Sequence, residues 1–252
     1  LCNSPGATIP EHEFKGQDEN PFVMGEFVWT GFDYLGEPDP CRDAGGRSSY
    51  FGIFDLAGIP KDRYWLYKSH WRRDVPSAHI LPHWTWPGRE GEITPVHVYT
   101  SGDEAELFVN GISKGRKKRG AHEYRFRWDD IRYEPGELRV KTWKNGREWA
   151  EDAVRTAHEP VSVERRESRF GRLTFVTFAL KDKNGEVCPN SDRVISFTTR
   201  PGTRLVSLCN GDAASRENFK GSSMRTFHGL LVAAVEGAPE GLEFTAADMR
   251  LK

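Results

Sequence analysis

The segment Gly25–Pro38 combines an aromatic ring and carboxylates in a pattern suited to binding a sugar. Its apolar run Phe27-Val28-Trp29 predicts a short buried strand, and the glycines and proline that follow predict an immediate loop that holds Asp33. An indole ring can pack on the apolar face of a pyranose, and a carboxylate can accept hydrogen bonds from sugar hydroxyls. Barrel enzymes build their sites where a strand opens into such a loop. Trp29 is therefore a candidate substrate-binding residue, and Asp33 is the carboxylate that follows it in the loop.

Two carboxylates of the same region, Glu26 and Glu37, suggest a second interpretation, a pair for retaining glycoside hydrolysis. The carboxyl groups of such a pair lie about 5–5.5 Å apart. Glu26 precedes the expected strand, whereas Glu37 lies in the loop that follows it. Their separation along an extended chain disfavours the pairing, so we expect no catalytic residue from it.

Three consecutive stretches carry a family resemblance: Phe27–Pro38, Arg47–Asp55 and Gly58–Tyr64. Dense in Trp, Gly and Pro and in the same order, they resemble the last strand and last helix of the catalytic barrel of glycoside hydrolase family 2, above all its bacterial β-galactosidase branch. In that family both catalytic carboxylates lie on earlier barrel strands. A complete (β/α)8 barrel needs roughly 250 residues by itself. The resemblance therefore implies the C-terminal portion of an enzyme, with no catalytic residue in this chain.

The resemblance also implies roles for the two candidate residues. Trp29 matches the Trp that forms the floor of the subsite for the terminal sugar, although a packed barrel Trp is the alternative. Asp33 matches a motif position and could hold the loop, bind a sugar hydroxyl or be purely structural. The family often uses Mg²⁺ or Na⁺, whose ligands mostly lie outside this segment, so we expect no cofactor here. The implied partners are a galactoside-containing carbohydrate and the N-terminal part of the enzyme, with a homo-oligomer left open.

Sugar specificity can be judged from the residues before Gly52-Ile53-Phe54. Family members that cleave glucuronides have an Asn and a Lys there, which bind the sugar carboxylate. This sequence has Ser49 and Phe51 at those places, and neither can neutralise a buried carboxylate. Arg47 is nearby and keeps the alternative open, but the pattern favours a neutral sugar such as galactose.

Composition excludes several other classes of function. The 252 residues have a formal net charge of −1, so no overall field favours nucleic acid or an anionic membrane. No apolar run approaches the ~20 residues of a membrane span. Eight Trp residues suit either sugar stacking or a β-sandwich core. No signal peptide is visible, and the compartment stays open, with periplasmic or extracellular preferred to cytoplasmic.

Several clusters have the residue types of a site without its spacing. The basic run Lys114–Arg119 could bind acidic polymers, but acidic clusters close in sequence favour a solvated loop. Glu11-His12-Glu13 and the pair His79 and His83 lack the spacing of a metal site, so we expect no metal. The four cysteines form no Cys-x-x-Cys motif, and whether Cys188 and Cys209 pair is left open.

The first part of the chain predicts one βα unit. Leu1–Gln17 is polar without a clear period and is interpreted as a loop. Pro60 suits the first position of a helix, and aromatic residues recur after it at helical spacing, so a helix is expected from there to Arg73. A single βα unit cannot close a core, so this helix needs the following domain to pack against. Pro76–Pro95 is interpreted as a Pro- and Trp-rich inter-domain stretch.

The remaining chain changes to a period of two. Alternating strands around Val96, Leu107, Phe126 and Val140 are joined by turns such as Asn110-Gly111 and Asn145-Gly146, and a second set follows the linker at Glu159-Pro160. The strands of the second set are expected at Leu173–Leu180, Val194–Thr198, Leu205–Cys209, Leu230–Val235 and Leu242–Ala246.

The fold class that follows is mainly β, with two immunoglobulin-like antiparallel β-sandwiches preceded by the last βα unit of a (β/α)8 barrel. The predicted domains are residues 1–77, 78–157 and 158–252. The function expected from the resemblance is the C-terminal portion of a retaining glycoside hydrolase that cleaves terminal β-galactosides. The alternative is a non-catalytic carbohydrate-binding or adhesive β-sandwich module.

Overall fold

The computed structural model describes residues 8–37 and 45–247. The chain forms two compact units, each built from two separate stretches. The first unit contains residues 1–29 and 60–156, and the second contains residues 30–59 and 157–252. The predicted division into residues 1–77, 78–157 and 158–252 concerns domains of the complete protein and stays a prediction.

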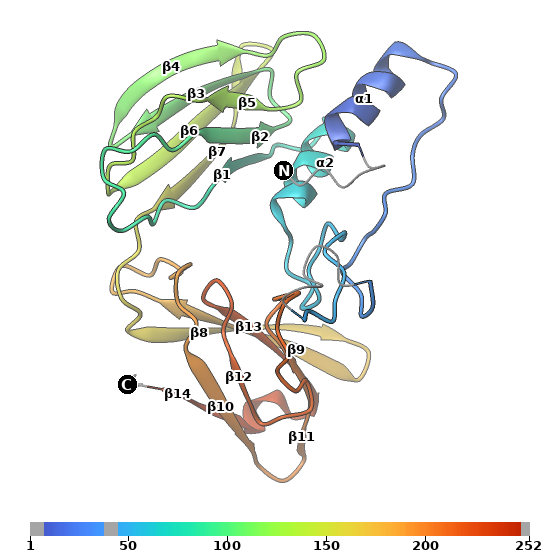
Figure 1. The fold of residues 1–252 in the computed structure, drawn as a ribbon, viewed down its shortest axis with the longest axis vertical. Coiled ribbons are helices and arrows are strands. Elements are labelled where there is room, and N and C mark those ends of the chain that lie inside the picture. Colours follow the sequence, from blue (N-terminus) through green and yellow to red (C-terminus); the bar gives the residue numbers. More distant parts are fainter. Residues whose placement is uncertain (1–7, 38–44, 248–252) are drawn as a thin grey trace. The chain divides into compact units, whose positions relative to one another are not determined.

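The first unit contains an antiparallel sandwich of two sheets, ordered β1-β2-β5 and β4-β3-β6-β7 (Figure 1). Two of its hairpins turn at the predicted Asn-Gly pairs, where Asn110, Gly111, Asn145 and Gly146 all have φ between 49° and 80°. Its strands are β1 (Ala78–Leu81), β2 (Val96–Thr100), β3 (Glu104–Val109), β4 (Ile112–Lys118), β5 (Phe126–Trp128), β6 (Glu137–Lys144) and β7 (Arg147–Arg155).

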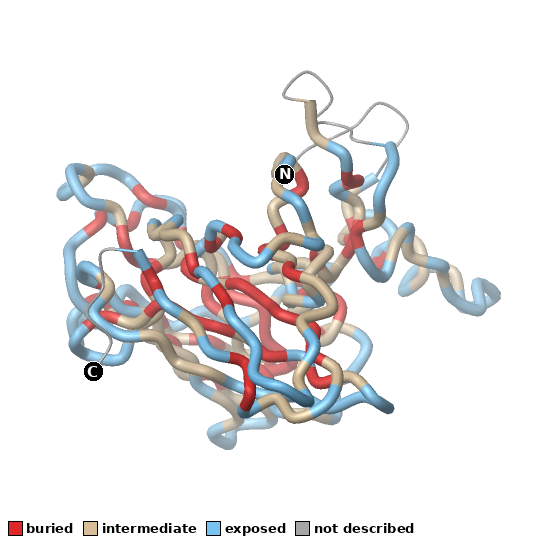
Figure 2. The backbone as a smooth tube through the Cα atoms, turned by 90° about the horizontal axis from the view of Figure 1, so that it is seen from below, coloured by how far each residue is buried: buried red, intermediate tan, exposed pale blue. Residues whose placement is uncertain are grey.

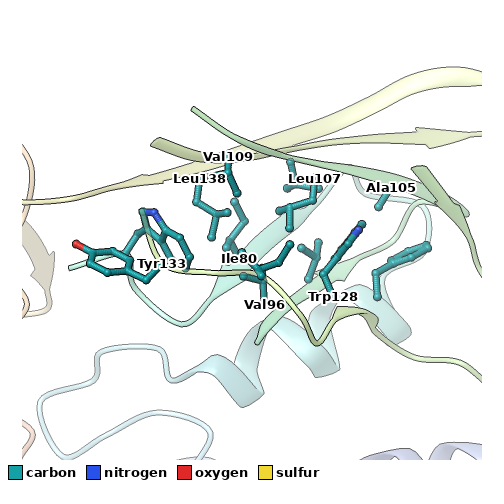
Figure 3. Close-up of a cluster of buried hydrophobic side chains, with 13 residues drawn as sticks. Ile80, Val96, Ala105, Leu107, Val109, Trp128, Tyr133 and Leu138 are labelled. Atoms are coloured by element: carbon teal, nitrogen blue, oxygen red, sulfur yellow. The ribbon is translucent and has the colours of Figure 1, made fainter. Parts of the chain in front are cut away.

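Buried side chains from both sheets meet in one core (Figure 3). Along β3 the inward residues Ala105, Leu107 and Val109 are at most 1% exposed and alternate with more exposed neighbours, as the period of two predicts. Figure 2 shows buried positions following the strands of the sandwiches. Trp84 is also fully buried in this core, and its indole N–H donates to the Glu134 carbonyl at 2.9 Å. The interpretation of Pro76–Pro95 as an inter-domain stretch is therefore wrong, because it contains a strand and a core residue of the first sandwich.

The second unit contains a second antiparallel sandwich, with sheets ordered β12-β10-β14 and β11-β13-β9-β8. The five strands predicted in this part are confirmed, whereas β8 and β12 were not predicted. Its elements are β8 (Ser162–Phe170), β9 (Leu173–Lys181), β10 (Val194–Thr199), β11 (Thr203–Cys209), β12 (Ser223–Arg225), β13 (Leu230–Gly237), the short 3-10 helix η1 (Pro239–Gly241) and β14 (Leu242–Ala246).

Two helices, α1 (Pro10–Glu19) and α2 (Asp62–Trp71), pack in the first unit. The predicted helix is confirmed, although it begins at Asp62, so Pro60 precedes it. The interpretation of residues 1–17 as a loop is wrong for α1. That helix has a single buried aromatic residue, Phe14, and therefore no apolar period to reveal it. Phe14 packs edge-on against Tyr124 of the sandwich, with 5.3 Å between the ring centroids.

The predicted buried strand Phe27-Val28-Trp29 is absent, since these residues belong to no strand in the described part of the chain. The Phe27 side chain is fully exposed and Trp29 is 70% exposed. A strand of a parallel barrel is stabilised by ladders to neighbouring strands, and these residues have no such ladder here. The prediction that this segment is barrel strand therefore rests on the family resemblance alone.

The basic run Lys114–Arg119 is not a loop but falls mostly within strand β4, at the edge of its sheet. Opposite charges on β3 explain why a charged stretch is extended here: Glu104 binds Arg116 at 2.8 Å, and the Arg116 guanidinium lies 3.6 Å from the centre of the Trp143 ring. Every residue of β4 is exposed, and such a charged edge disfavours pairing with another chain.

The fold class is confirmed: the chain is mainly β, with two antiparallel sandwiches. Cys188 and Cys209 are free thiols, which settles the question left open, whereas Cys2 and Cys41 lie outside the described residues. Among the helices of the described part, none is long and apolar enough to span a membrane.

Candidate functional site

The loop from Thr30 to Ile59 carries most of the residues singled out from the sequence, and it belongs to the second unit. Its two arms are joined by backbone hydrogen bonds, including Phe54 N to Gly31 O at 2.9 Å and Ser49 N to Tyr34 O at 2.7 Å. Phe32 and Phe54 stack with ring centroids 5.1 Å apart. The described part of the loop therefore has a defined backbone without regular strands.

Asp33 is buried, at 4% exposure, and lies between the two arms. Its Oδ1 accepts a hydrogen bond from the backbone N–H of Gly52 at 2.8 Å, while its own N–H donates to the Phe54 carbonyl at 3.0 Å. A Cβ at position 52 would lie 2.2 Å from the Asp33 nitrogen, so only glycine fits there. Asp33 thus has a role in holding the loop, and its contact with a sugar stays a prediction.

The residues used to judge sugar specificity also have roles within the loop. Ser49 is fully buried, and its hydroxyl oxygen accepts a hydrogen bond from the Tyr34 N–H at 2.9 Å. The Arg47 guanidinium donates to the Glu217 carbonyl and lies 4.9 Å from the centre of the Phe219 ring. Arg47, which kept a glucuronide open as an alternative, is therefore engaged by the second sandwich.

Trp29 is the last residue of the first unit, so it and Asp33 are described within different units. Its side chain is 70% exposed, as a sugar platform requires. This exposure does not distinguish a sugar platform from packing in a complete barrel. The assignment of Trp29 to substrate binding therefore stays a prediction.

The two carboxylates considered as a pair differ in their surroundings. Burial raises the pKa of Glu26, the charge of Glu13 raises it further, and a hydrogen bond from Gln17 lowers it. Glu37 accepts a hydrogen bond from the Tyr34 hydroxyl within the second unit. Glu26 belongs to the first unit, so the two carboxylates are described within different units.

The first unit contains a cavity of about 270 Å³, lined by side chains of α1, α2 and the sandwich, that no sequence pattern predicts. Most of its polar groups bind one another. The Tyr124 hydroxyl donates to Asp18 at 2.8 Å, and the Arg119 guanidinium donates to the carbonyls of Thr100, Gly102 and Glu123. Few donors remain to recognise a ligand, so the cavity is not a convincing binding site. Among the described residues, no cluster of His, Cys, Asp or Glu has the arrangement of a metal site.

Sequence reasoning missed the importance of Gly52 and of the pairing between Arg47 and Phe219. The close approach at Gly52 could have been suspected from the Gly-Ile-Phe motif itself. No local signal could have revealed the contact of Phe219 with Arg47, because the two residues lie 172 positions apart along the chain.

Two family descriptions match the chain. Glycoside hydrolase family 2 C-terminal domain 5 matches residues 163–250, and Domain of unknown function (DUF4982) matches residues 91–150. The matches cover most of the second and first sandwiches, respectively.

Three relatives illustrate the similarity. A β-galactosidase of Bacteroides ovatus is 38% identical over the whole of this chain, which spans 30% of that enzyme's length. A β-glucuronidase of Bacteroides fragilis is 28% identical over 54% of this chain, which corresponds to 19% of that protein. The crystal structure of a β-glycosidase from Bacteroides vulgatus has a TM-score of 0.87 and 33% identity, covering 96% of this chain and 32% of that one.

The chain thus spans about a third of the length of the β-galactosidase and of the β-glycosidase, and about a fifth of the length of the β-glucuronidase. The matched C-terminal domain, the high identity along the whole chain and the shared fold agree with one another. We conclude that this chain belongs to glycoside hydrolase family 2 and carries C-terminal domains of an enzyme of that family.

Proposed function

We propose that the complete protein is a retaining β-galactosidase and that this chain supplies part of the wall of its sugar pocket. The observation that carries the galactoside assignment is the pair Ser49 and Phe51. Ser49 is fully buried and bound to Tyr34, and Phe51 is apolar, so neither offers a positive charge to a uronic acid. The identity to the Bacteroides ovatus β-galactosidase along the whole chain supports the same choice.

Hydrolysis would follow the double displacement, in which one carboxyl group acts as acid and base and another as nucleophile. Both would come from parts of the protein before this segment. The exposed indole of Trp29 would pack on the apolar face of the terminal sugar. Asp33, fixed by the Gly52 N–H at 2.8 Å, would hold its carboxylate in a constant direction. A bound Mg²⁺ or Na⁺ would be held by residues outside this segment.

The substrate assignment can be tested by comparing nitrophenyl β-galactoside with nitrophenyl β-glucuronide as substrates of the complete protein. We expect kcat/KM to be at least 100-fold higher for the galactoside, because an unpaired carboxylate would have to be desolvated in the pocket. ¹H NMR of the first sugar released should show the β-anomer. Preference for the glucuronide would refute the galactoside assignment, and release of the α-anomer would refute the retaining mechanism.

The role of Trp29 requires a variant of its own. Trp29→Ala should lower kcat/KM on galactosides at least tenfold, equivalent to ~1.4 kcal/mol of transition-state stabilisation. Trp71→Ala removes another half-exposed tryptophan from the same unit and should change kcat/KM less than threefold. Both variants must melt at the wild-type temperature. Equal activity of Trp29→Ala and wild type would mean that Trp29 serves packing alone.

The purified 252-residue chain should not hydrolyse either substrate. Turnover that disappears in Glu26→Gln or Glu37→Gln would show that the chain contains catalytic carboxylates after all. A complete protein that binds galactosides without hydrolysing them would instead favour the non-catalytic module.

A further inference from the structure

The second sandwich contacts the loop Thr30–Ile59 through the segment Asn210–Gly221, which we call the anchor segment. The Arg47 guanidinium lies over the Phe219 ring, 4.9 Å from its centre, and donates to the Glu217 carbonyl. Nearby, Arg216 Nε donates to the Gly45 carbonyl at 3.0 Å. Closer to the C-terminal end of the loop, a Cβ on Gly211 would lie 2.0 Å from Asp55 Oδ2, so the Gly211 backbone lies against the Asp55 carboxylate. The loop is thus held near its middle and near its C-terminal end.

The anchor segment is itself well ordered by hydrogen bonds. Asn210 is 4% exposed, and its side chain donates to the Arg225 carbonyl at 3.0 Å while accepting from Asp212 N at 3.1 Å. The Phe219 carbonyl accepts from Leu208 N in β11 at 2.8 Å, and the Phe219 ring packs against the core of the second sandwich. Phe219 therefore has a fixed position against which Arg47 can rest.

An unbroken series of contacts leads from Phe219 to Asp33. The carbonyl of Arg47 accepts a hydrogen bond from Gly36 N at 2.7 Å. Two residues further along, Ser49 and Tyr34 exchange hydrogen bonds of 2.7 and 2.9 Å. The arm then reaches Gly52, whose N–H binds Asp33. A displacement of Arg47 would therefore be transmitted along hydrogen-bonded backbone to the candidate substrate-binding carboxylate.

We propose that Phe219 is a positioning residue for the sugar pocket, acting through Arg47 on the loop that holds Asp33. This inference rests on the proposed function of that loop. The Phe219 ring attracts the guanidinium electrostatically and limits where the Arg47 backbone can lie. Small displacements of groups that hold a substrate have large effects on rate. The second sandwich would then contribute to substrate binding through the position of the loop.

The kinetic test uses the complete protein and nitrophenyl β-galactoside. Phe219→Leu keeps apolar volume in the core but removes the aromatic face, and Phe219→Tyr keeps the face. We expect Phe219→Leu to raise KM about fivefold with kcat within twofold of wild type. Phe219→Tyr should have wild-type values of both KM and kcat. Arg47→Gln should have the same effect, and the double variant Arg47→Gln with Phe219→Leu should be no worse than either. Arg204→Gln, which breaks an exposed ion pair with Glu236 elsewhere in the second unit, is the matched control and should leave KM unchanged.

A second measurement does not depend on activity. Hydrogen–deuterium exchange of the peptide spanning residues 45–56 reports on the amides of Ser49, Gly52 and Phe54. In the complete protein, Phe219→Leu should raise exchange at this peptide at least threefold, while the β9 peptide stays unchanged and Phe219→Tyr behaves as wild type.

The outcomes separate the two proposals. Faster exchange and a raised KM in Phe219→Leu, with wild-type exchange and KM in Phe219→Tyr, support the positioning role. Unchanged exchange, or faster exchange with unchanged KM, overturns it. If the wild-type protein hydrolyses no galactoside, the proposed function fails. In that case faster exchange in Phe219→Leu but not in Phe219→Tyr still supports Phe219 as the anchor of the loop. Unchanged exchange in Phe219→Leu rejects this role of Phe219.

Discussion

His70 should make the first unit sensitive to mild acid. Its ring stacks on Phe14 with centroids 4.0 Å apart, meets Tyr124 edge-on, and has Nδ1 2.9 Å from an Arg73 nitrogen. The pKa of His70 is lowered from 6.5 to about 4, mainly by burial and in addition by the charges of Arg73 and Arg119, while the charge of Asp18 acts in the opposite direction. His70 is therefore neutral in the folded unit at pH 7 and down to about pH 5.

The direction of the effect follows from which state binds the proton. Between its folded and unfolded pKa values, His70 is protonated in the unfolded chain but not in the folded one. The unfolded state therefore binds more protons, and stability falls as the pH is lowered from about 7 toward 4. With pKa values of about 4 and 6.5, this residue alone should cost about 2 kcal/mol of unfolding free energy at pH 5 relative to pH 7.

Tryptophan fluorescence of the 252-residue chain reports on unfolding of the first unit, because all eight Trp residues of the chain belong to that unit. Urea unfolding at pH 7 and pH 5 would be compared for wild type, for His70→Phe and for His12→Gln, which changes an exposed histidine of α1. His70→Phe keeps a ring against Phe14 but cannot titrate, so its loss of stability at pH 5 should be about 2 kcal/mol smaller than that of wild type. His12→Gln should behave as wild type. An equal loss in wild type and His70→Phe would refute the assignment.

Three further substitutions test the packing. Gly52→Ala places a Cβ 2.2 Å from the Asp33 nitrogen and should lower kcat/KM of the complete protein at least tenfold. Gly31→Ala, whose new Cβ meets open space in the same loop, should change kcat/KM less than threefold. Equal activities of the two variants would contradict the close approach at Gly52. Arg119→Gln leaves the carbonyls of Thr100 and Gly102 without their donor and should lower the unfolding free energy of the first unit by about 2–4 kcal/mol in urea. A decrease below about 0.5 kcal/mol would show that water replaces the guanidinium. Leu107→Ala empties a fully buried site and should cost about 2–5 kcal/mol by the same fluorescence assay, and a cost near zero would mean that the core of Figure 3 is not tightly packed.

Most of the β structure could be predicted from the sequence because its signals are local. Alternation along Ala105, Leu107 and Val109 identifies the buried face of β3, and Asn110-Gly111 supplies the left-handed conformation that a two-residue hairpin requires. Strand β4 escaped prediction because its stability comes from cross-strand charges on β3 and from Trp143, not from its own composition. Helix α1 escaped because one phenylalanine provides most of its buried contact.

The candidate site was predictable only in part. The motif identified the loop and its residues, but the pairing of Arg47 with Phe219 joins residues 172 positions apart, and no local pattern encodes such a contact. The expected strand at Phe27 failed for a related reason. Its apolar residues match a barrel strand, yet a strand exists only when others pair with it, and the pairing partners are not part of either unit.

The division of both units into separate stretches has a consequence for synthesis on the ribosome. The chain leaves the first unit at Trp29, returns to it at Pro60 and leaves it again after Thr156. The loop that ends at Ile59 must therefore wait until β14, ending at Ala246, has been made, which is about 190 residues later. At 5–20 residues per second this delay is about 10–40 s. During that time Arg47 and Asp55 lack the sandwich that they contact in the folded chain, whereas every residue of the first unit has been made by Thr156. The loop therefore completes its contacts later than the first unit does.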